Sequence, residues 1–168
     1  MTKTEKIKLT LKAWPVITVI VVAACFFTNQ IAFLFDHEFP QQNQVKCLKF
    51  LLSHAFSNSY YFWMSALNVL NALLIMPIVE EVVFRWFIWR LPQPKRVHVQ
   101  TVISAVIFSA AHYITNPFPD NAFAALFLFG LAQCWIYRKT DSLACCMLNH
   151  SLFNLTNLIL LFVIPEHV

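Results

Sequence analysis

Three segments of the sequence place ionisable or amide side chains inside runs of apolar residues. The members that could do chemistry are Glu80, Glu81, Arg85, His112, His150 and Asn154. An ionisable group at membrane depth costs roughly 2.5–3.5 kcal/mol on insertion scales and usually faces a partner or a cavity. Together the set has the residue types that hydrolysis needs. A carboxylate can activate water, a histidine can orient it, and hydrogen-bond donors can stabilise an oxyanion.

The first segment, residues 77–85, carries two adjacent glutamates. Glu81 and Arg85 are spaced i, i+4, so they share a helix face and can form an ion pair. Glu80 is turned away by about 100° on the helical wheel and lacks that partner. A carboxylate without a partner in apolar surroundings is suited to work as a general base. The alternative is that both glutamates only neutralise Arg85 and Arg90 near the membrane boundary, although one buried arginine needs only one carboxylate.

The second and third segments each carry a histidine. His112 follows Phe108 and three small residues, 109–111, which allow another helix to approach closely. His150 and Asn154 lie one helical turn apart on one face. Taken separately, His112 could be an interfacial residue, and the polar positions around His150 could form an interhelical hydrogen-bond network.

The composition defines the class of protein. Of the 168 residues, 59% are hydrophobic and 12% are charged, against roughly 25% charged in a soluble domain. A small fold buries only about 70% of its chain's surface, so a soluble domain of this length could not hide so much apolar area. The composition therefore excludes a soluble globular domain, a disordered chain and a DNA-binding module. The five cysteines lack CxxC spacing and do not suggest a disulfide framework.

The apolar runs predict an all-α, polytopic membrane helix bundle of about five spanning helices, since each run approaches the roughly 20 residues that cross a bilayer. Residues 1–59 are expected to form an anchor helix, with Pro15 in its first turn, followed by a loop and an interfacial segment. Residues 60–168 are expected to form the core that carries the candidate residues. The expected spans are Ala13–Phe35, Tyr60–Leu91, Val97–Tyr113, Ala122–Tyr137 and Ser142–Ile164.

The basic residues predict the orientation of the bundle. With five spans and a cytoplasmic N-terminus, nine lysines and arginines fall on the cytoplasmic side and two, Lys46 and Lys49, on the other. Counting along the helices places Glu80 about 15 Å from Arg90 and His112 about 24 Å from Arg96. For the two side chains to meet, helix tilt or a more deeply placed third helix must absorb the difference of about 9 Å.

The three segments together resemble the CAAX protease and bacteriocin-processing family, also called the CPBP, Abi or Rce1-like family. Its motifs are EExxxR, FxxxH and HxxxN on successive core helices. Here they read Glu80-Glu81-xxx-Arg85, Phe108-xxx-His112 and His150-xxx-Asn154, in that order. The resemblance covers roughly residues 71–158. It departs where the family often has glycine, at Trp86 and at Asp141 within Thr140-Asp141-Ser142.

The resemblance implies a glutamic-type intramembrane endopeptidase. Glu80 would be the general base, and His112 would help it bind the attacking water. His150 and Asn154 would form the oxyanion hole, and Glu81 and Arg85 would orient and support Glu80. The substrate would be a membrane-delivered peptide or protein tail, such as a prenylated C-terminus, a peptide antibiotic or a sorting signal. No cofactor is implied.

Three other functions remain open from the residues. A zinc ion could be bound by His112, His150 and a glutamate, although no HExxH is present. The two histidines could ligate a membrane haem. The polar cluster could line the passage of a transporter or belong to a partner-binding subunit. The expected partners are the lipid bilayer and a membrane-associated substrate, not nucleic acid. The expected location is a multi-pass position in a bacterial inner membrane.

Overall fold

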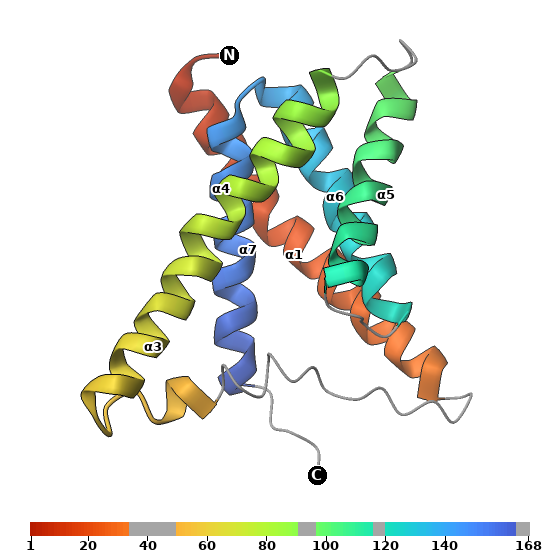
Figure 1. Ribbon diagram of the computed structural model, residues 1–168. Helices are drawn as coiled ribbons and strands as arrows, with labels where there is room; N and C mark the ends of the chain where they lie inside the picture. Colours follow the sequence, from red (N-terminus) through yellow and green to blue (C-terminus); the bar gives the residue numbers. More distant parts are fainter. Residues whose placement is uncertain (34–49, 91–96, 116–119, 164–168) are drawn as a thin grey trace.

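The computed structural model describes residues 1–33, 50–90, 97–115 and 120–163, which form helices and turns without a strand (Figure 1). The predicted loop 36–49, the basic pair 95–96 and the turn 116–119 lie outside the described residues. The helical elements are α1 (Lys3–Phe33), α3 (Ser59–Leu70), η1 (Asn71–Ile75), α4 (Met76–Glu81), η2 (Val82–Phe87), η3 (Ile88–Arg90), α5 (Val97–Thr115), α6 (Asp120–Thr140) and α7 (Leu143–Val163).

Helix α1 begins ten residues earlier than the apolar run predicts. Thr2 and Glu5 form a capping box, in which the Thr2 N–H donates to Glu5 Oε2 at 2.7 Å and the Glu5 N–H donates to Thr2 Oγ1 at 3.2 Å. This cap starts the helix at Lys3, ahead of the residues that hydropathy selects. The prediction that Pro15 lies in the first helical turn is therefore wrong, because Pro15 lies inside α1.

The second expected span is a continuous run of helical turns from Ser59 to Arg90, but it is not a uniform α-helix. Asn58 caps its start by accepting the Tyr61 N–H at 3.1 Å. Two π-helical segments, η1 and η2, interrupt it on either side of the short helix α4, and the 3-10 turn η3 ends it. Each π turn inserts an extra residue into the helical register, so both change the direction in which later side chains point.

The helices have the lengths and composition of a membrane bundle. Among the described residues, three helices are long and apolar enough to cross a membrane: Lys3–Ala24, Ser59–Arg90 and Leu143–Leu160. The third expected span corresponds to α5, whose apolar part, His98–Ile114, is slightly shorter. The fourth corresponds to α6, which is not among these candidates; it contains Gln133 and ends on Arg138 and Lys139.

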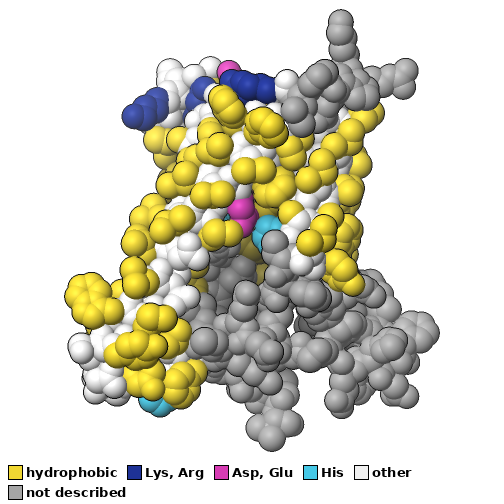
Figure 2. All heavy atoms as spheres, in the orientation of Figure 1, with side chains coloured by type: hydrophobic (Ala, Val, Ile, Leu, Met, Phe, Trp, Pro, Cys, Tyr) yellow, Lys and Arg dark blue, Asp and Glu magenta, His cyan; other side chains and the backbone are white. Residues whose placement is uncertain are grey.

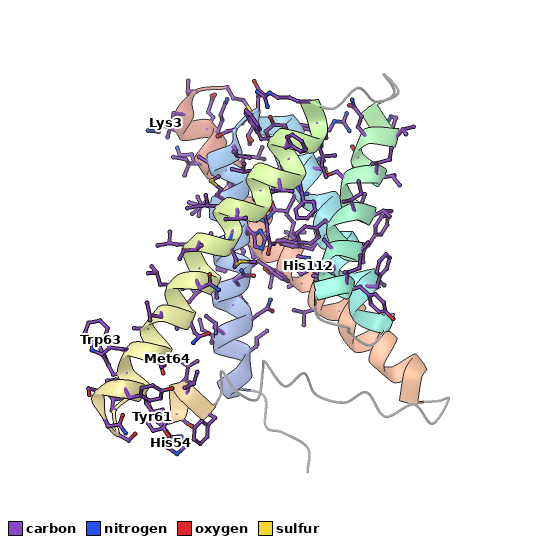
Figure 3. All side chains as sticks on the ribbon, viewed as in Figure 1. Lys3, His54, Tyr61, Trp63, Met64 and His112 are labelled. Atoms are coloured by element: carbon purple, nitrogen blue, oxygen red, sulfur yellow. The ribbon has the colours of Figure 1, made fainter. Side chains whose placement is uncertain are left out.

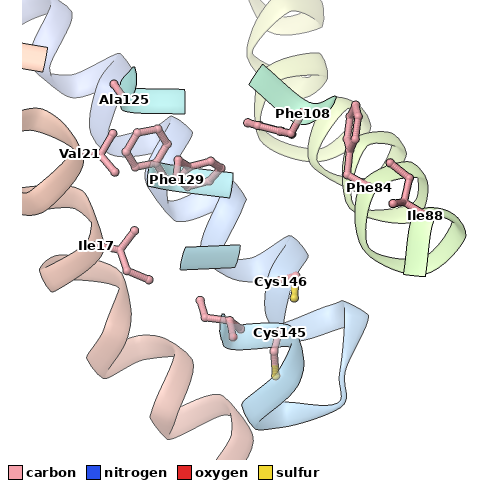
Figure 4. Packing of buried hydrophobic residues seen from close by; sticks show 11 residues of the cluster. Ile17, Val21, Phe84, Ile88, Phe108, Ala125, Phe129, Cys145 and Cys146 are labelled. Carbon is pink, nitrogen blue, oxygen red and sulfur yellow. The ribbon is translucent and has the colours of Figure 1, made fainter. Parts of the chain in front are cut away.

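The core lies where α1, α5, α6 and α7 meet the α4–η2 segment (Figure 4). Helix α1 contributes Ile17 and Val21 to the same cluster as Phe108 and Phe129, so it packs into the bundle. Helices α5 and α6 approach closely at Gly130, where a Cβ would lie 3.0 Å from the Cα of Ala105. The cysteines 134, 145 and 146 are buried free thiols.

The surface is apolar between two ends of different character. Lysine and arginine side chains gather at one end of the bundle, and hydrophobic side chains cover the face below them (Figure 2). Lys3 lies at that end, Tyr61 and Trp63 lie at the opposite end, and His112 lies between them (Figure 3). Large apolar side chains such as Val19 and Leu67 are exposed by 67% and 57%. This pattern indicates a lipid-facing belt with basic and aromatic borders.

Candidate active site

The two glutamates lie on α4, a helix of less than two turns that begins next to a proline. Pro77 is buried in the first turn of α4 and has no N–H to donate to the turn before it. Glu80 and Glu81 follow in the next turn, and both are buried. Neighbouring positions on a helix differ by about 100° in direction. The two carboxylates therefore point in different directions, and His150 contacts both of them.

The predicted pair of Glu81 and Arg85 is present. Glu81 Oε2 lies 3.2 Å from Arg85 Nε, and both side chains are fully buried. Arg85 also donates from Nη1 to the Ser104 hydroxyl at 3.2 Å, and its guanidinium lies 5.2 Å from the centroid of the Phe108 ring. A buried guanidinium needs such a set of partners, because an unpaired charge in apolar surroundings is strongly unfavourable.

Glu80 has two histidine neighbours in place of an arginine. Its Oε2 atom lies 3.6 Å from Nε2 of His112 and 3.6 Å from Nε2 of His150. These side chains come from α4, α5 and α7. The inclination of the α3–α4 run relative to α5 (Figure 1) brings Glu80 and His112 to the same depth, although they lie at different distances along the chain from the basic end.

The second nitrogen of each histidine is held by an oxygen. His112 Nδ1 lies 2.9 Å from the carbonyl oxygen of Phe108, and His150 Nδ1 lies 2.8 Å from Glu81 Oε1. Carbonyl and carboxylate oxygens only accept hydrogen bonds, so both Nδ1 atoms carry the proton. In neutral rings the Nε2 atoms are then acceptors, and they converge with Glu80 Oε2. Three converging acceptors suit a species that brings hydrogens, such as a water molecule.

Aromatic rings enclose the cluster. Phe108 packs edge-on against Phe84 at 5.2 Å and lies 4.4 Å from the His112 ring, while Phe129 packs against His150 at 4.9 Å. These rings keep bulk water out, which strengthens the electrostatic interactions inside. Exposure is confined to one side, because the His112 side chain is 24% exposed and that of His150 only 5%. Figure 2 shows an acidic side chain beside a histidine at this level of an otherwise hydrophobic face.

Asn154 lies one turn beyond His150 on α7 and contacts a different part of the second span. Its Nδ2 atom donates to the carbonyl oxygen of Ala72, in η1, at 2.8 Å. The structure thus brings Glu80, Glu81 and Arg85 together with the two histidines. Asn154 contacts the helical turn before α4 from its place on α7. The division of catalytic roles among these residues stays a prediction.

Two side chains in or beside the cluster were not singled out by the sequence analysis. Ser104 is fully buried, binds Arg85, and donates to the carbonyl oxygen of Phe84 at 2.7 Å. A polar residue two turns before His112 in an otherwise apolar helix was the feature of the sequence that could have identified it. Phe129 offered no signal, because an aromatic residue in an apolar helix is ordinarily a packing residue.

The donor set also bears on metals and haem. Two imidazole nitrogens and a carboxylate oxygen are ligand types that zinc accepts. Within the described ranges, however, no group of three or more His, Cys, Asp or Glu side chains has an arrangement that could hold a metal ion. A haem iron would need the same two Nε2 atoms that converge on the Glu80 carboxylate.

The comparisons with known proteins agree with the three motifs. A family model described as Type II CAAX prenyl endopeptidase Rce1-like matches residues 61–156, which is more than half of the chain. The matched range contains all six candidate residues. No curated protein and no solved structure gives a significant match.

Proposed function

We propose that this chain, which belongs to the type II CAAX prenyl endopeptidase Rce1-like family, hydrolyses peptide bonds within the membrane. The attacking water would be activated at Glu80. The observation that carries this proposal is the convergence of the Nε2 atoms of His112 and His150 on Glu80 Oε2, each at 3.6 Å, inside an apolar bundle. Proton-accepting atoms in this arrangement can bind and orient one water molecule.

In the proposed reaction Glu80 takes a proton from this water while the oxygen of the water bonds to the scissile carbonyl carbon. The C–N bond then breaks, and Glu80 returns the proton to the leaving amine. The products are a new carboxyl terminus and a free amine, and no co-reactant other than water is consumed. His112, which is the more exposed of the two histidines, orients the water on the side from which substrate can approach.

His150 and Glu81 form the second half of the proposed mechanism. A negatively charged oxygen develops on the substrate when water adds, and it needs a hydrogen-bond donor. His150 can donate from Nε2 when its ring is protonated, and the 2.8 Å contact between its Nδ1 and Glu81 Oε1 holds the ring in a fixed orientation. Arg85 in turn holds Glu81. Glu81 and Arg85 are therefore positioning residues, and Asn154 is an additional donor only in the interpretation drawn from family resemblance.

The proposed substrate is a membrane-delivered peptide or protein tail. A prenylated C-terminal tail is the first candidate because the family is described by that activity. The apolar, lipid-facing surface around the partly exposed His112, which contacts the buried Glu80, would let a lipid-anchored chain reach the site from within the bilayer. Residues 60–168 form the proposed catalytic core, and a bacterial inner membrane is the proposed location.

The test is cleavage of a fluorescent prenylated peptide by the purified protein in lipid vesicles. Glu80→Gln and His112→Ala should each lower the cleavage rate by on the order of 100-fold or more. Glu5→Gln and His54→Ala remove a glutamate and a histidine at exposed positions outside the site and serve as matched controls. Wild-type activity in Glu80→Gln would contradict the proposal.

The same assay separates the proposal from the alternatives. A zinc-dependent protease using the same residues would lose activity with a chelator and regain it when zinc is added. The proposed mechanism predicts no effect of the chelator. A transporter or partner-binding subunit would show no cleavage by the wild-type protein, and its cellular function would persist in a folded Glu80→Gln variant.

A further inference from the structure

The helix that carries Glu80 and Glu81 is bounded by two π turns, and each turn leaves a carbonyl group for another helix to bind. In η1 the last π-type bond joins the Met76 N–H to the Asn71 carbonyl. The next bond in this register would run from residue 77 to the carbonyl of Ala72. Residue 77 is proline and has no N–H, so that bond cannot form.

Asn154 of α7 supplies the missing donor. Its Nδ2 atom lies 2.8 Å from the Ala72 carbonyl oxygen, across 82 residues of sequence. A carbonyl without a donor inside a membrane protein costs more than it does in water, because no solvent can replace the lost bond. The contact therefore fixes α7 to the turn from which α4 begins, five residues before Pro77 and eight before Glu80.

The second π turn shows the same arrangement with a different helix. In η2 the last π-type bond joins the Ile88 N–H to the Val83 carbonyl. The carbonyl of the next residue, Phe84, accepts the hydroxyl of Ser104 from α5 at 2.7 Å. Ser104 also receives a hydrogen bond from Arg85, the partner of Glu81. At both ends of α4, the first carbonyl beyond the π bonds is thus held by a side chain of a neighbouring helix.

We propose that Asn154 and Ser104 are positioning residues that clamp the Glu80–Glu81 helix at its two ends and thereby set the direction of both carboxylates. This inference rests on the proposed function of Glu80 as the base. It assigns Asn154 a role through α4, in place of the direct contact with the oxyanion that the family resemblance implies. A shift of about 1 Å at the base can cost on the order of 100-fold in rate. Hydrogen bonds that hold the helix of the base in place therefore affect the catalytic rate.

A double-mutant cycle between Asn154 and Pro77 separates the two roles. Asn154→Leu should lower kcat by about 10-fold to 100-fold with a smaller change in KM. Pro77→Ala restores an N–H that can donate to the Ala72 carbonyl. In that background the further loss caused by Asn154→Leu should fall below about threefold, because the carbonyl no longer depends on Asn154. Equal losses in both backgrounds would overturn the proposal and assign Asn154 to the oxyanion.

Hydrogen exchange provides a readout that does not depend on activity or on Pro77→Ala. The clamp predicts faster amide exchange in segment 71–88 for Asn154→Leu and for Ser104→Ala in detergent micelles. Asn157→Leu, a matched change on the same helix, should leave exchange in that segment unchanged. Unaltered exchange in the first two variants would refute the clamp. A wild-type protein that cleaves no peptide would refute the proposed function, while the exchange experiment would still decide the clamp.

Discussion

The Glu81–Arg85 pair allows a quantitative test of how the cluster is held in the bundle. Both side chains are 0% exposed, with 3.2 Å between Arg85 Nε and Glu81 Oε2. In Glu81→Gln the guanidinium keeps the Ser104 hydroxyl and the Phe108 ring, and neither carries a charge. Removing one partner of a buried pair costs about 3–5 kcal/mol because the other charge is left uncompensated. We expect the free energy of unfolding of Glu81→Gln to fall by that amount.

The double variant Glu81→Gln/Arg85→Met removes the stranded charge as well. Replacing both members of a buried pair by uncharged groups is often close to neutral for stability. The double variant should therefore be more stable than Glu81→Gln alone by about 2 kcal/mol or more. Its peptidase activity should remain lost, because His150 no longer has the Glu81 carboxylate beside Nδ1. The second mutation would then restore stability without restoring catalysis.

Equilibrium unfolding in mixed detergent micelles measures these differences. Arg90→Met is the matched control, since Arg90 stacks on Trp86 at an exposed end of the same helix, with 4.3 Å between its guanidinium carbon and the ring centroid. It should leave the unfolding transition unchanged. If the double variant is no more stable than Glu81→Gln, the two losses are independent, and the argument that Glu81 compensates a buried charge is wrong.

Two further predictions concern the packing that supports the site. Gly130→Ala places a Cβ 3.0 Å from the Cα of Ala105 and should lower the free energy of unfolding by about 1–3 kcal/mol. It should also slow cleavage, because it displaces the helix that carries His112. Unchanged unfolding and kinetics would contradict the close packing. Asp141, between α6 and α7, has a φ of 45°, a backbone conformation that favours glycine. Asp141→Gly should therefore maintain or raise stability, and Asp141→Ala should lower it by about 1 kcal/mol. Equal thermal unfolding temperatures for the two variants would show that this backbone conformation carries no strain.

Much of the fold could be predicted because the length of each apolar run fixes the length of a spanning helix. The second, third and fifth helices begin and end within two residues of the expected boundaries, as far as the described residues reach. Hydropathy failed at the N-terminus, where lysines interrupt the apolar pattern and a capping box starts the helix. The two π turns were also missed, because their register depends on donors from distant helices; Pro77 was the one local signal of such a break.

The site could be predicted only in part from spacing. The i, i+4 rule identified the contact of Glu81 with Arg85, since both residues lie on one helix. The contact of His150 with Glu81 joins residues 69 positions apart, and no periodicity in the sequence indicates it. Family resemblance supplied the grouping of the three motifs. It did not indicate the hydrogen bond from Asn154 to Ala72, which depends on the proline that precedes the glutamates.

The most direct measurement is the turnover number of the wild-type protein and of Glu80→Gln, with a prenylated peptide at saturating concentration in lipid vesicles. Glutamine keeps the shape of the side chain and cannot accept a proton from water. We expect the turnover number of Glu80→Gln to fall by about 100-fold to 10,000-fold, with Glu5→Gln unaffected. A Glu80→Gln variant that turns over within threefold of the wild type would contradict the role of Glu80 as the base, because water would then be activated without the carboxylate on which both histidines converge.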